Sequence, residues 1–230
     1  MVRVLKSFPR VAALLRDVRG RLLHRPTTEI SKVTVGSSYG SHTIPAGVLH
    51  AKSVVYSFGV GTDISFDQGL IDLIGCTIHA FDPTPRSIAW ISQQPTSEHL
   101  VFHGFGLGEK DGALAFQQPS KVNHVSYSRA TGAKEVQLLP VKRLGTIMLE
   151  LQHDHIDLLK LDIEGFEYAA IEDMLGSGIY PRFIAVEFHH GMYGFTDHQT
   201  NAAMKAASDK GYKLFHVSET GREYSLMYNP

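Results

Sequence analysis

The sequence predicts an α/β protein whose mostly parallel β-sheet is covered by helices on both faces. From about residue 50 onward, short apolar segments alternate with segments of helical periodicity. The strand segments are almost continuously apolar, which is typical of parallel strands buried on both faces. The 230 residues fit one domain with an extension, at a prior of ~150 residues per domain. No internal repeat or linker divides residues 50–230.

The strands are expected to follow the apolar runs. Residues 104–142 are less regular, with two expected strands around a polar loop at 119–134. The last two runs are joined by the short segment 219–222, which contains a glycine and predicts an antiparallel terminal hairpin. Strands are expected over 50–58, 76–81, 99–103, 113–117, 135–141, 156–161, 183–188, 212–217 and 224–228.

Helices are expected between these strands, over 63–74, 86–94, 141–151, 166–175 and 197–210. Ser65 and Gln68 fit a capping box near the start of the first of these helices, and Gly75 is in position to end it. Thr196 and Asp197 are the N-cap candidates of the last one.

The N-terminal segment differs from the rest in charge. Residues 1–25 hold seven basic residues and one acidic residue, a balance of +6, so the remaining chain carries −7. Apolar residues at helical spacing predict a basic amphipathic helix that ends at Arg25-Pro26. We therefore divide the chain into an N-terminal helix and arm, 1–32, and a domain, 33–230. We expect the helix to pack on the domain or on a second subunit, as in a homodimer; contact with a membrane surface or a polyanion is the alternative. The apolar positions are Val11, Leu14, Leu15, Val18 and Leu22.

Composition excludes several classes of protein. The net charge of −1 gives no overall attraction to nucleic acid. No apolar run approaches the ~20 residues that span a bilayer, so no transmembrane segment is expected. The N-terminus lacks the features of a secretory signal. A single cysteine, Cys76, cannot form an internal disulfide, which suits a reducing compartment, and we expect a cytoplasmic protein.

Two strand ends indicate a nucleoside-containing cofactor. Ligands of such sheets bind beyond the carboxyl ends of the strands. Gly59 and Gly61 follow the first strand of the alternating region and permit close approach of a ligand to the backbone. Ile64 stands where a dinucleotide fingerprint has its third glycine, which disfavours a pyrophosphate. Asp82 follows the next strand, where an acidic side chain accepts hydrogen bonds from a ribose. A purely structural turn is the alternative for both features.

Two further strand ends carry groups suited to catalysis. Asp162 and Glu164 follow an apolar strand, and their alternative role is to stabilise the start of the next helix. Glu187 and His189 share a face at the end of the following strand. A histidine titrates near neutral pH and suits proton transfer or metal ligation, so we expect these groups to meet at one rim of the sheet.

These residues resemble a known family. The segments Tyr56–Asp67, Ala80–Pro83, Leu159–Glu167 and Val186–His189 are similar to the FkbM-type methyltransferases, as is Val35–Gly40 ahead of them. The family consists of class I enzymes that depend on S-adenosylmethionine and have a Rossmann-like, seven-stranded sheet. The resemblance covers about residues 33–230, and the block 159–167 is its most specific part. The chain departs from the class pattern at Ser57, where an acidic residue is common, and at Asp63, in place of the third glycine.

The resemblance implies a set of cofactor-binding residues. Gly59 and Gly61 would lie beside the methionine part of S-adenosylmethionine, and Asp82 would bind its ribose. Gly106 would lie beside the adenine, and Asp162 between the methionine part and the methyl acceptor. Asp63 and Ser65, next in the same segment, are counted with them, and Tyr39 is a candidate to cover the site.

The implied reaction is an in-line transfer of the methyl group to a hydroxyl of a sugar, glycan or secondary metabolite. Because S-adenosylmethionine is already activated, the protein mainly positions the acceptor and removes its proton. His189 is the first candidate for the base, with His190 and Glu164 next, so the catalytic set is His189, Asp162 and Glu164. A divalent metal held by Asp162 with Glu187 or His189 is an alternative that we do not favour.

Other functions remain as alternatives. A nicotinamide-dependent oxidoreductase would need a dinucleotide site, against which Ile64 argues. A non-catalytic binding module would hold the cofactor without methyl transfer. A nucleic-acid methyltransferase is less favoured, because the chain lacks an Asn/Asp-Pro-Pro-aromatic motif.

Overall fold

A computed structural model describes residues 24–95, 97–117, 128–129 and 136–230. The expected N-terminal helix and most of the polar loop 119–134 lie outside the described residues. The division of the chain at residue 32 stays a prediction. No helix in the described part of the chain is long and apolar enough to cross a membrane.

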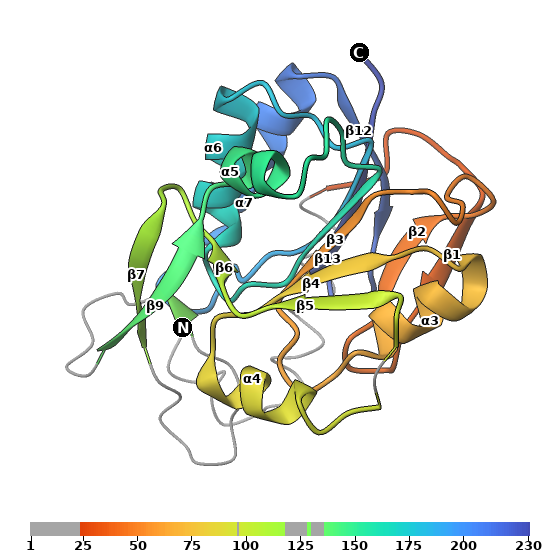
Figure 1. The fold of residues 1–230 in the computed structure, drawn as a ribbon. Coiled ribbons are helices and arrows are strands. Elements are labelled where there is room, and N and C mark those ends of the chain that lie inside the picture. Colours follow the sequence, from red (N-terminus) through yellow and green to blue (C-terminus); the bar gives the residue numbers. More distant parts are fainter. Residues whose placement is uncertain (1–23, 96, 118–127, 130–135) are drawn as a thin grey trace, which may run out of the picture.

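A seven-stranded sheet forms the centre of the molecule (Figure 1). Its order is β12-β13-β11-β10-β3-β4-β5, and the pairs from β11 to β5 are parallel. Strand β13 is antiparallel to both of its neighbours, which confirms the predicted mostly parallel sheet with an antiparallel terminal hairpin. The strands are β3 (Val55–Phe58), β4 (Ile78–Phe81), β5 (Leu100–His103), β10 (Leu158–Leu161), β11 (Phe183–Glu187), β12 (Tyr212–Val217) and β13 (Glu223–Tyr228).

The helices pack on both faces of this sheet, as the apolar strands require. Along β10, Leu159 and Leu161 belong to one hydrophobic cluster and Leu158 to another, because successive side chains of a strand point to opposite faces. The first cluster includes residues of α5, α6 and α7, and the second includes residues of α3. The helices are α3 (Ser65–Ile74), α4 (Pro85–Ile91), α5 (Leu144–Glu150), α6 (Glu167–Gly176) and α7 (Asp197–Asp209).

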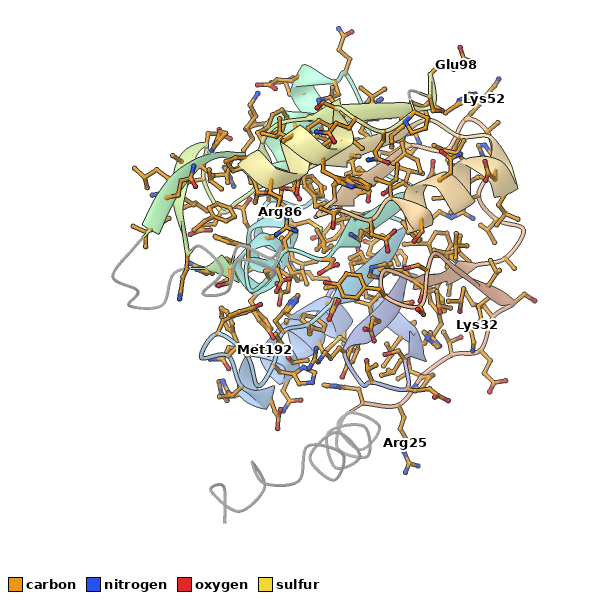
Figure 2. The ribbon with its side chains drawn as sticks, turned by 90° about the horizontal axis from the view of Figure 1, so that it is seen from below. Arg25, Lys32, Lys52, Arg86, Glu98 and Met192 are labelled. Atoms are coloured by element: carbon orange, nitrogen blue, oxygen red, sulfur yellow. The ribbon has the colours of Figure 1, made fainter. Side chains whose placement is uncertain are left out.

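Charged side chains at the periphery are consistent with this layering. Lys32, Lys52 and Glu98 are exposed and lie at the outer edge of the molecule (Figure 2). The largest fully buried side chains are instead aromatic or aliphatic, such as Tyr56 and Phe58.

Two smaller sheets were not predicted. A hairpin of β1 (Lys32–Val35) and β2 (His42–Pro45) packs near β11 and β13. A four-stranded sheet follows the order β6-β9-β7-β8, with β6 (Gly106–Leu107), β7 (Gly112–Gln117), β8 (Ser128–Arg129) and β9 (Val136–Lys142). The strands at 113–117 and 135–141 were expected, but their separation into a second sheet was not. Because β9 extends to Lys142, α5 begins at Leu144 rather than at 141.

Of the predicted helix caps, one is wrong. The N-cap of α3 is Ile64, without a side-chain hydrogen bond, so Ser65 and Gln68 form no capping box. The Ser65 N–H instead donates to Asp63 Oδ1 at 2.8 Å. An Asp side chain readily accepts a hydrogen bond from the backbone N–H two residues later, so this N–H is not available to Gln68. Gly75 ends α3 in a left-handed conformation, as predicted. Thr196 caps α7 and forms a capping box with Gln199.

Candidate active site

A cleft opens at the carboxyl ends of β3, β4 and β10, where the order of strands reverses along the chain. It holds about 920 Å³ of empty space, part of it open to solvent. Eight of the predicted site residues line it, whereas Ser65 and His189 do not. The eight are Tyr39, Gly59, Gly61, Asp63, Asp82, Gly106, Asp162 and Glu164.

The two glycines after β3 differ in what requires them. Gly59 has φ of +89°, and a Cβ atom there would lie 1.7 Å from the Asp162 carbonyl oxygen. Gly61 has φ of +56°, and a Cβ atom there would meet no atom within 4 Å. Contact between two backbone segments therefore explains Gly59, whereas Gly61 faces open space in the cleft.

Asp82 is held rigidly beside this turn. It is buried, its Oδ2 accepts a hydrogen bond from Gly61 N at 2.9 Å, and its Oδ1 accepts from Thr84 N at 2.8 Å. The Thr84 hydroxyl donates to the same Oδ1 at 2.6 Å. Each carboxylate oxygen has two acceptor positions, so Asp82 can still accept a hydrogen bond from a ligand. The carboxylate thus connects the glycine turn to the end of β4.

Asp63 connects the turn to the segment before β2. Its Oδ2 accepts a hydrogen bond from Ser37 Oγ at 2.6 Å, and Ser37 N donates to Ser65 Oγ at 2.7 Å. Burial opposes ionisation of Asp63, but the hydrogen bonds from Ser37 and Ser65 outweigh it and lower the pKa. Ser65 therefore supports the wall of the cleft from outside. Tyr39 lies at the rim and is 82% exposed.

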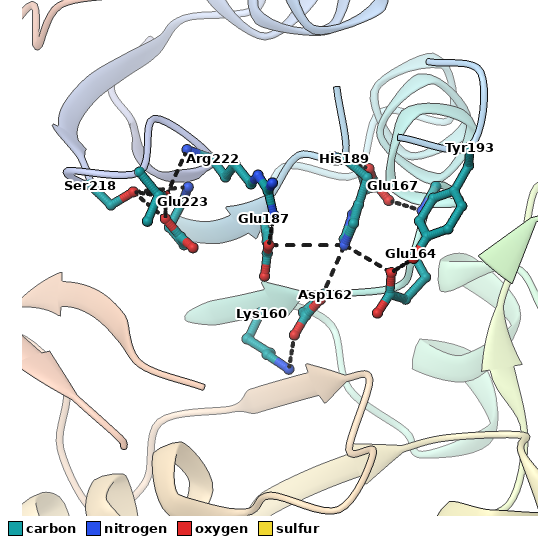
Figure 3. A network of polar contacts seen from close by, with 12 residues as sticks. Lys160, Asp162, Glu164, Glu167, Glu187, His189, Tyr193, Ser218, Arg222 and Glu223 are labelled. Carbon is teal, nitrogen blue, oxygen red and sulfur yellow. Dashed lines mark hydrogen bonds and ion pairs between the residues drawn. The ribbon is translucent and has the colours of Figure 1, made fainter. Parts of the chain in front are cut away.

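His189 lies among four carboxylates from three elements of the fold (Figure 3). It is 2% exposed, and its Nδ1 lies 3.2 Å from Glu167 Oε1, which also accepts a hydrogen bond from the His189 backbone N–H. A carboxylate only accepts hydrogen bonds, so we assign the Nδ1 proton to this contact. Nε2 faces Glu164 Oε2 at 3.2 Å, Asp162 Oδ1 at 3.8 Å and Glu187 Oε1 at 4.0 Å.

The charges of this cluster are strongly perturbed. Burial opposes protonation of His189, but Glu164 and Glu167 outweigh it and raise its pKa well above the usual value. Burial raises the pKa of Asp162, against the opposing charges of Lys160 and His189. Burial, followed by repulsion from Asp162, raises the pKa of Glu187 to about 8. The cluster can therefore bind and release protons near neutral pH.

The structure brings together Asp162, Glu164 and His189, with one candidate ligand atom of each within 4.8 Å of the others. His190 lies apart from them, with its Nδ1 3.3 Å from Thr200 Oγ1. Sequence reasoning missed Glu167, which is fully buried, and Lys160. Both lie in the block 159–167, and a lysine inside an apolar strand was the available signal.

Comparison with known proteins identifies the family of the chain. A family model described as "Methyltransferase domain" matches residues 41–222. The human "Probable methyltransferase-like protein 24" is 25% identical over 174 residues, which cover 70% of this chain and 42% of the relative. Its rat counterpart is 27% identical over 175 residues, covering 71% and 42%. The chain thus spans less than half the length of these curated relatives.

Among solved structures, a methyltransferase FkbM from Methylobacillus flagellatus KT matches with a TM-score of 0.48 and 17% identity. The match covers 80% of this chain and 46% of that chain.

Proposed function

The chain belongs to the methyltransferase family whose model spans residues 41–222, and we propose that it transfers a methyl group from S-adenosylmethionine to a hydroxyl of a sugar, glycan or secondary metabolite. The observation that carries this proposal is the cleft itself. A glycine turn with an attached carboxylate forms one wall, and the carboxylates of Asp162 and Glu164 form another. Burial raises the pKa of Asp162.

The geometry of the cleft supports the following roles for cofactor-binding residues. The open face of Gly61 lets the methionine part approach the backbone, and Asp82, fixed on that same backbone, binds the ribose. Gly106 packs against Pro83, where a Cβ atom would come within 3.0 Å of the proline ring, and borders the adenine. Tyr39 covers the opening from the rim.

Proton removal from the acceptor falls to the carboxylates that face the cleft. An oxygen acceptor must lie about 3 Å from the methyl carbon, in line with the bond that breaks. Asp162 and Glu164 line the cleft, whereas His189 is buried behind them. Burial raises the pKa of Asp162, which makes it a stronger base than an ordinary carboxylate, and His189 orients Asp162 and Glu164 through its Nε2.

A divalent cation is the alternative that the same cluster permits. Asp162, Glu164 and His189 offer one nitrogen and two carboxylate ligands. Glu167 contacts the other ring nitrogen, as a carboxylate behind a metal-bound histidine does in many metal sites. A cation there would lower the pKa of an acceptor hydroxyl. Methyl transfer that persists in EDTA would leave only the general base, whereas loss in EDTA and recovery with Mg²⁺ would establish the metal.

Calorimetric titration with S-adenosylmethionine, S-adenosylhomocysteine and NAD tests the cofactor. We expect both sulfur compounds to bind and NAD not to bind. Asp82→Ala should weaken binding by about 10-fold or more, since hydrogen bonds to charged groups contribute ~1.5–3 kcal/mol. Asp72→Ala, at an exposed position of α3, is the matched control and should bind as wild type.

Asp82→Asn keeps the shape of the side chain that supports the turn. It therefore separates an effect of the carboxylate on cofactor binding from an effect on folding. A wild-type protein that prefers NAD, or that binds neither sulfur compound while folded by circular dichroism, would refute the proposed function. Equal affinity of wild type and a folded Asp82→Ala variant for S-adenosylmethionine would refute only the proposed binding of the ribose by Asp82.

A further inference from the structure

Lys160 is a charged residue of the cleft to which the proposed function gives no role. It lies in β10, the strand between β3 and β11, and is paired in register with Ser57 and Ala185. It is 6% exposed, which is rare for a lysine. Burying an ammonium group is unfavourable unless hydrogen bonds and opposite charges compensate. The contacts of the Lys160 ammonium group must therefore compensate for its burial.

The ammonium group holds the glycine turn. Lys160 Nζ donates hydrogen bonds to the Gly59 carbonyl oxygen at 2.7 Å and to the Phe58 carbonyl oxygen at 3.2 Å. These carbonyls lie at the end of β3, where strand pairing stops. A charged donor makes stronger hydrogen bonds than a neutral one, so the start of the turn is fixed to the neighbouring strand.

The same group reaches the acceptor side of the cleft. Lys160 Nζ lies 3.8 Å from Asp162 Oδ2 (Figure 3). The backbone of Asp162 also touches the turn, because Gly59 leaves no room for a Cβ atom beside the Asp162 carbonyl. Lys160 therefore contacts the turn that carries Gly61 and the segment that carries Asp162 and Glu164. Of the described residues that line the cleft, Lys160 alone has a cationic side chain of the Lys or Arg type.

We propose that Lys160 is a positioning residue that fixes the glycine turn of the cofactor site against the carboxylates of the acceptor site. The inference rests on the proposed function, since it concerns the alignment of S-adenosylmethionine with the acceptor. Alignment matters because a displacement of about 1 Å can cost ~100-fold in rate. The lysine joins the two halves by donating hydrogen bonds to main-chain carbonyls, so a side chain of similar length without a donor cannot replace it.

The test compares Lys160→Met, which keeps the length but removes the donors, with Lys160→Arg, which keeps a charged donor. Leu159→Ala, a buried truncation on the opposite face of the same strand, reports the effect of destabilising β10 alone. Lys52→Met, at an exposed position, reports the loss of one lysine charge. For each variant, S-adenosylmethionine affinity is measured by calorimetry and stability by thermal unfolding.

We expect Lys160→Met to bind S-adenosylmethionine at least ~10-fold more weakly than wild type, because the cofactor must then order a turn that charged hydrogen bonds fix in the wild type. Lys160→Arg should recover part of that loss. Leu159→Ala should lower the melting temperature with less than about a threefold change in affinity, and Lys52→Met should change neither.

A folded Lys160→Met variant that binds like wild type would overturn the proposal, and so would an equal loss of affinity in Leu159→Ala at matched stability. If Lys160→Met does not fold, Lys160→Arg and Lys160→Gln decide the matter. Both keep donors for the turn, and a loss of affinity of ~10-fold or more in both would overturn the proposal. Absence of binding in the wild type would instead refute the proposed function.

Discussion

Two clusters in this fold hold histidine in opposite states. In the His189 group, His189 and the four carboxylates around it, the histidine is buried. In the His79 group, formed by His79, His103, His153 and Tyr56, the histidines are half-buried. His189 is surrounded by carboxylates, and its pKa is raised. His79, on β4, lies among rings: its Nδ1 is 3.1 Å from His103 Nε2, and it packs against Tyr56 and His153. Burial, with the nearby His103 and His153, lowers the pKa of His79 to about 4. Burial favours the neutral form of both histidines, and the carboxylates around His189 reverse that preference.

The two groups also differ in what they do for the fold. The His189 group joins the ends of β10 and β11 and the start of α6 through charge, and it borders the cleft. The His79 group fills space on one face of the sheet as neutral rings, and Tyr56 also lies within 2.8 Å of His153 Nδ1 through its hydroxyl. We therefore expect removal of a partner to be costly in the first group and tolerated in the second.

The largest effect is expected for Glu167→Ala, which leaves His189 without the partner of its Nδ1 and of its backbone N–H. Breaking a buried ion pair by removing one partner costs ~3–5 kcal/mol of unfolding free energy. Glu172→Ala, at an exposed position of the same helix, should stay within ~0.5 kcal/mol of wild type. Urea unfolding followed by circular dichroism measures both, and equal stabilities would contradict the ionic assignment of the His189 group.

An NMR titration of the imidazole rings sharpens the comparison without any substitution. We expect His189 to lose its proton only well above pH 6.5, and His79 to remain neutral until the pH falls toward about 4. A His189 signal that titrates at or below 6.5 would mean that the surrounding carboxylates share protons and do not stabilise the imidazolium.

These directions set opposite contributions to stability. His189 has a raised pKa in the folded state, so its contribution is complete below pH 6.5 and is lost as the pH rises through the raised value. His79 has a lowered pKa, so its contribution is present above pH 6.5 and is lost as the pH falls toward about 4.

The smallest effect is expected for His79→Phe, which keeps an aromatic ring and removes one hydrogen bond. At pH 7 the unfolding free energy should change by no more than ~1 kcal/mol, the usual net value of a hydrogen bond. Between pH 6.5 and 4.5 the variant should gain stability relative to wild type, because it no longer carries the group that protonates on unfolding. Chemical denaturation at several pH values checks this, and a constant difference across the range would show that the fold does not lower the pKa of His79.

Much of the main sheet was predictable from the sequence, because parallel strands buried on both faces read as apolar runs. The terminal hairpin, the Gly75 helix end and the Thr196 cap also follow from local signals. The β1–β2 hairpin does not, because strands of four residues are too short to show a clear alternation. The second sheet does not either, since the two-residue strand Gly106–Leu107 carries no periodicity and pairs with the distant Val141 and Lys142.

At the candidate site the sequence predicted which strand ends meet but not which side chains face the cleft. His189, Asp162 and Glu164 come together as expected, yet only the two carboxylates reach the open side. His189 does not reach the open side because it is buried and because Glu167, at the start of α6, contacts its Nδ1. The alternation of residues along a strand does not reveal how deeply a side chain is buried or which distant elements it contacts, so neither was predictable.

The contacts between the first and the last described segments have a consequence for synthesis of the chain. Thr27 and Thr28 donate backbone hydrogen bonds to Leu214, and Ser225 donates to the carbonyl of Thr43, 182 residues earlier. At ribosomal rates of ~5–20 residues per second, roughly 10–40 s separate the emergence of these partners. Until then the β1–β2 hairpin and the inner strands lack their contacts with β12 and β13. A nascent chain of this protein therefore exposes apolar surface that a chaperone is suited to cover.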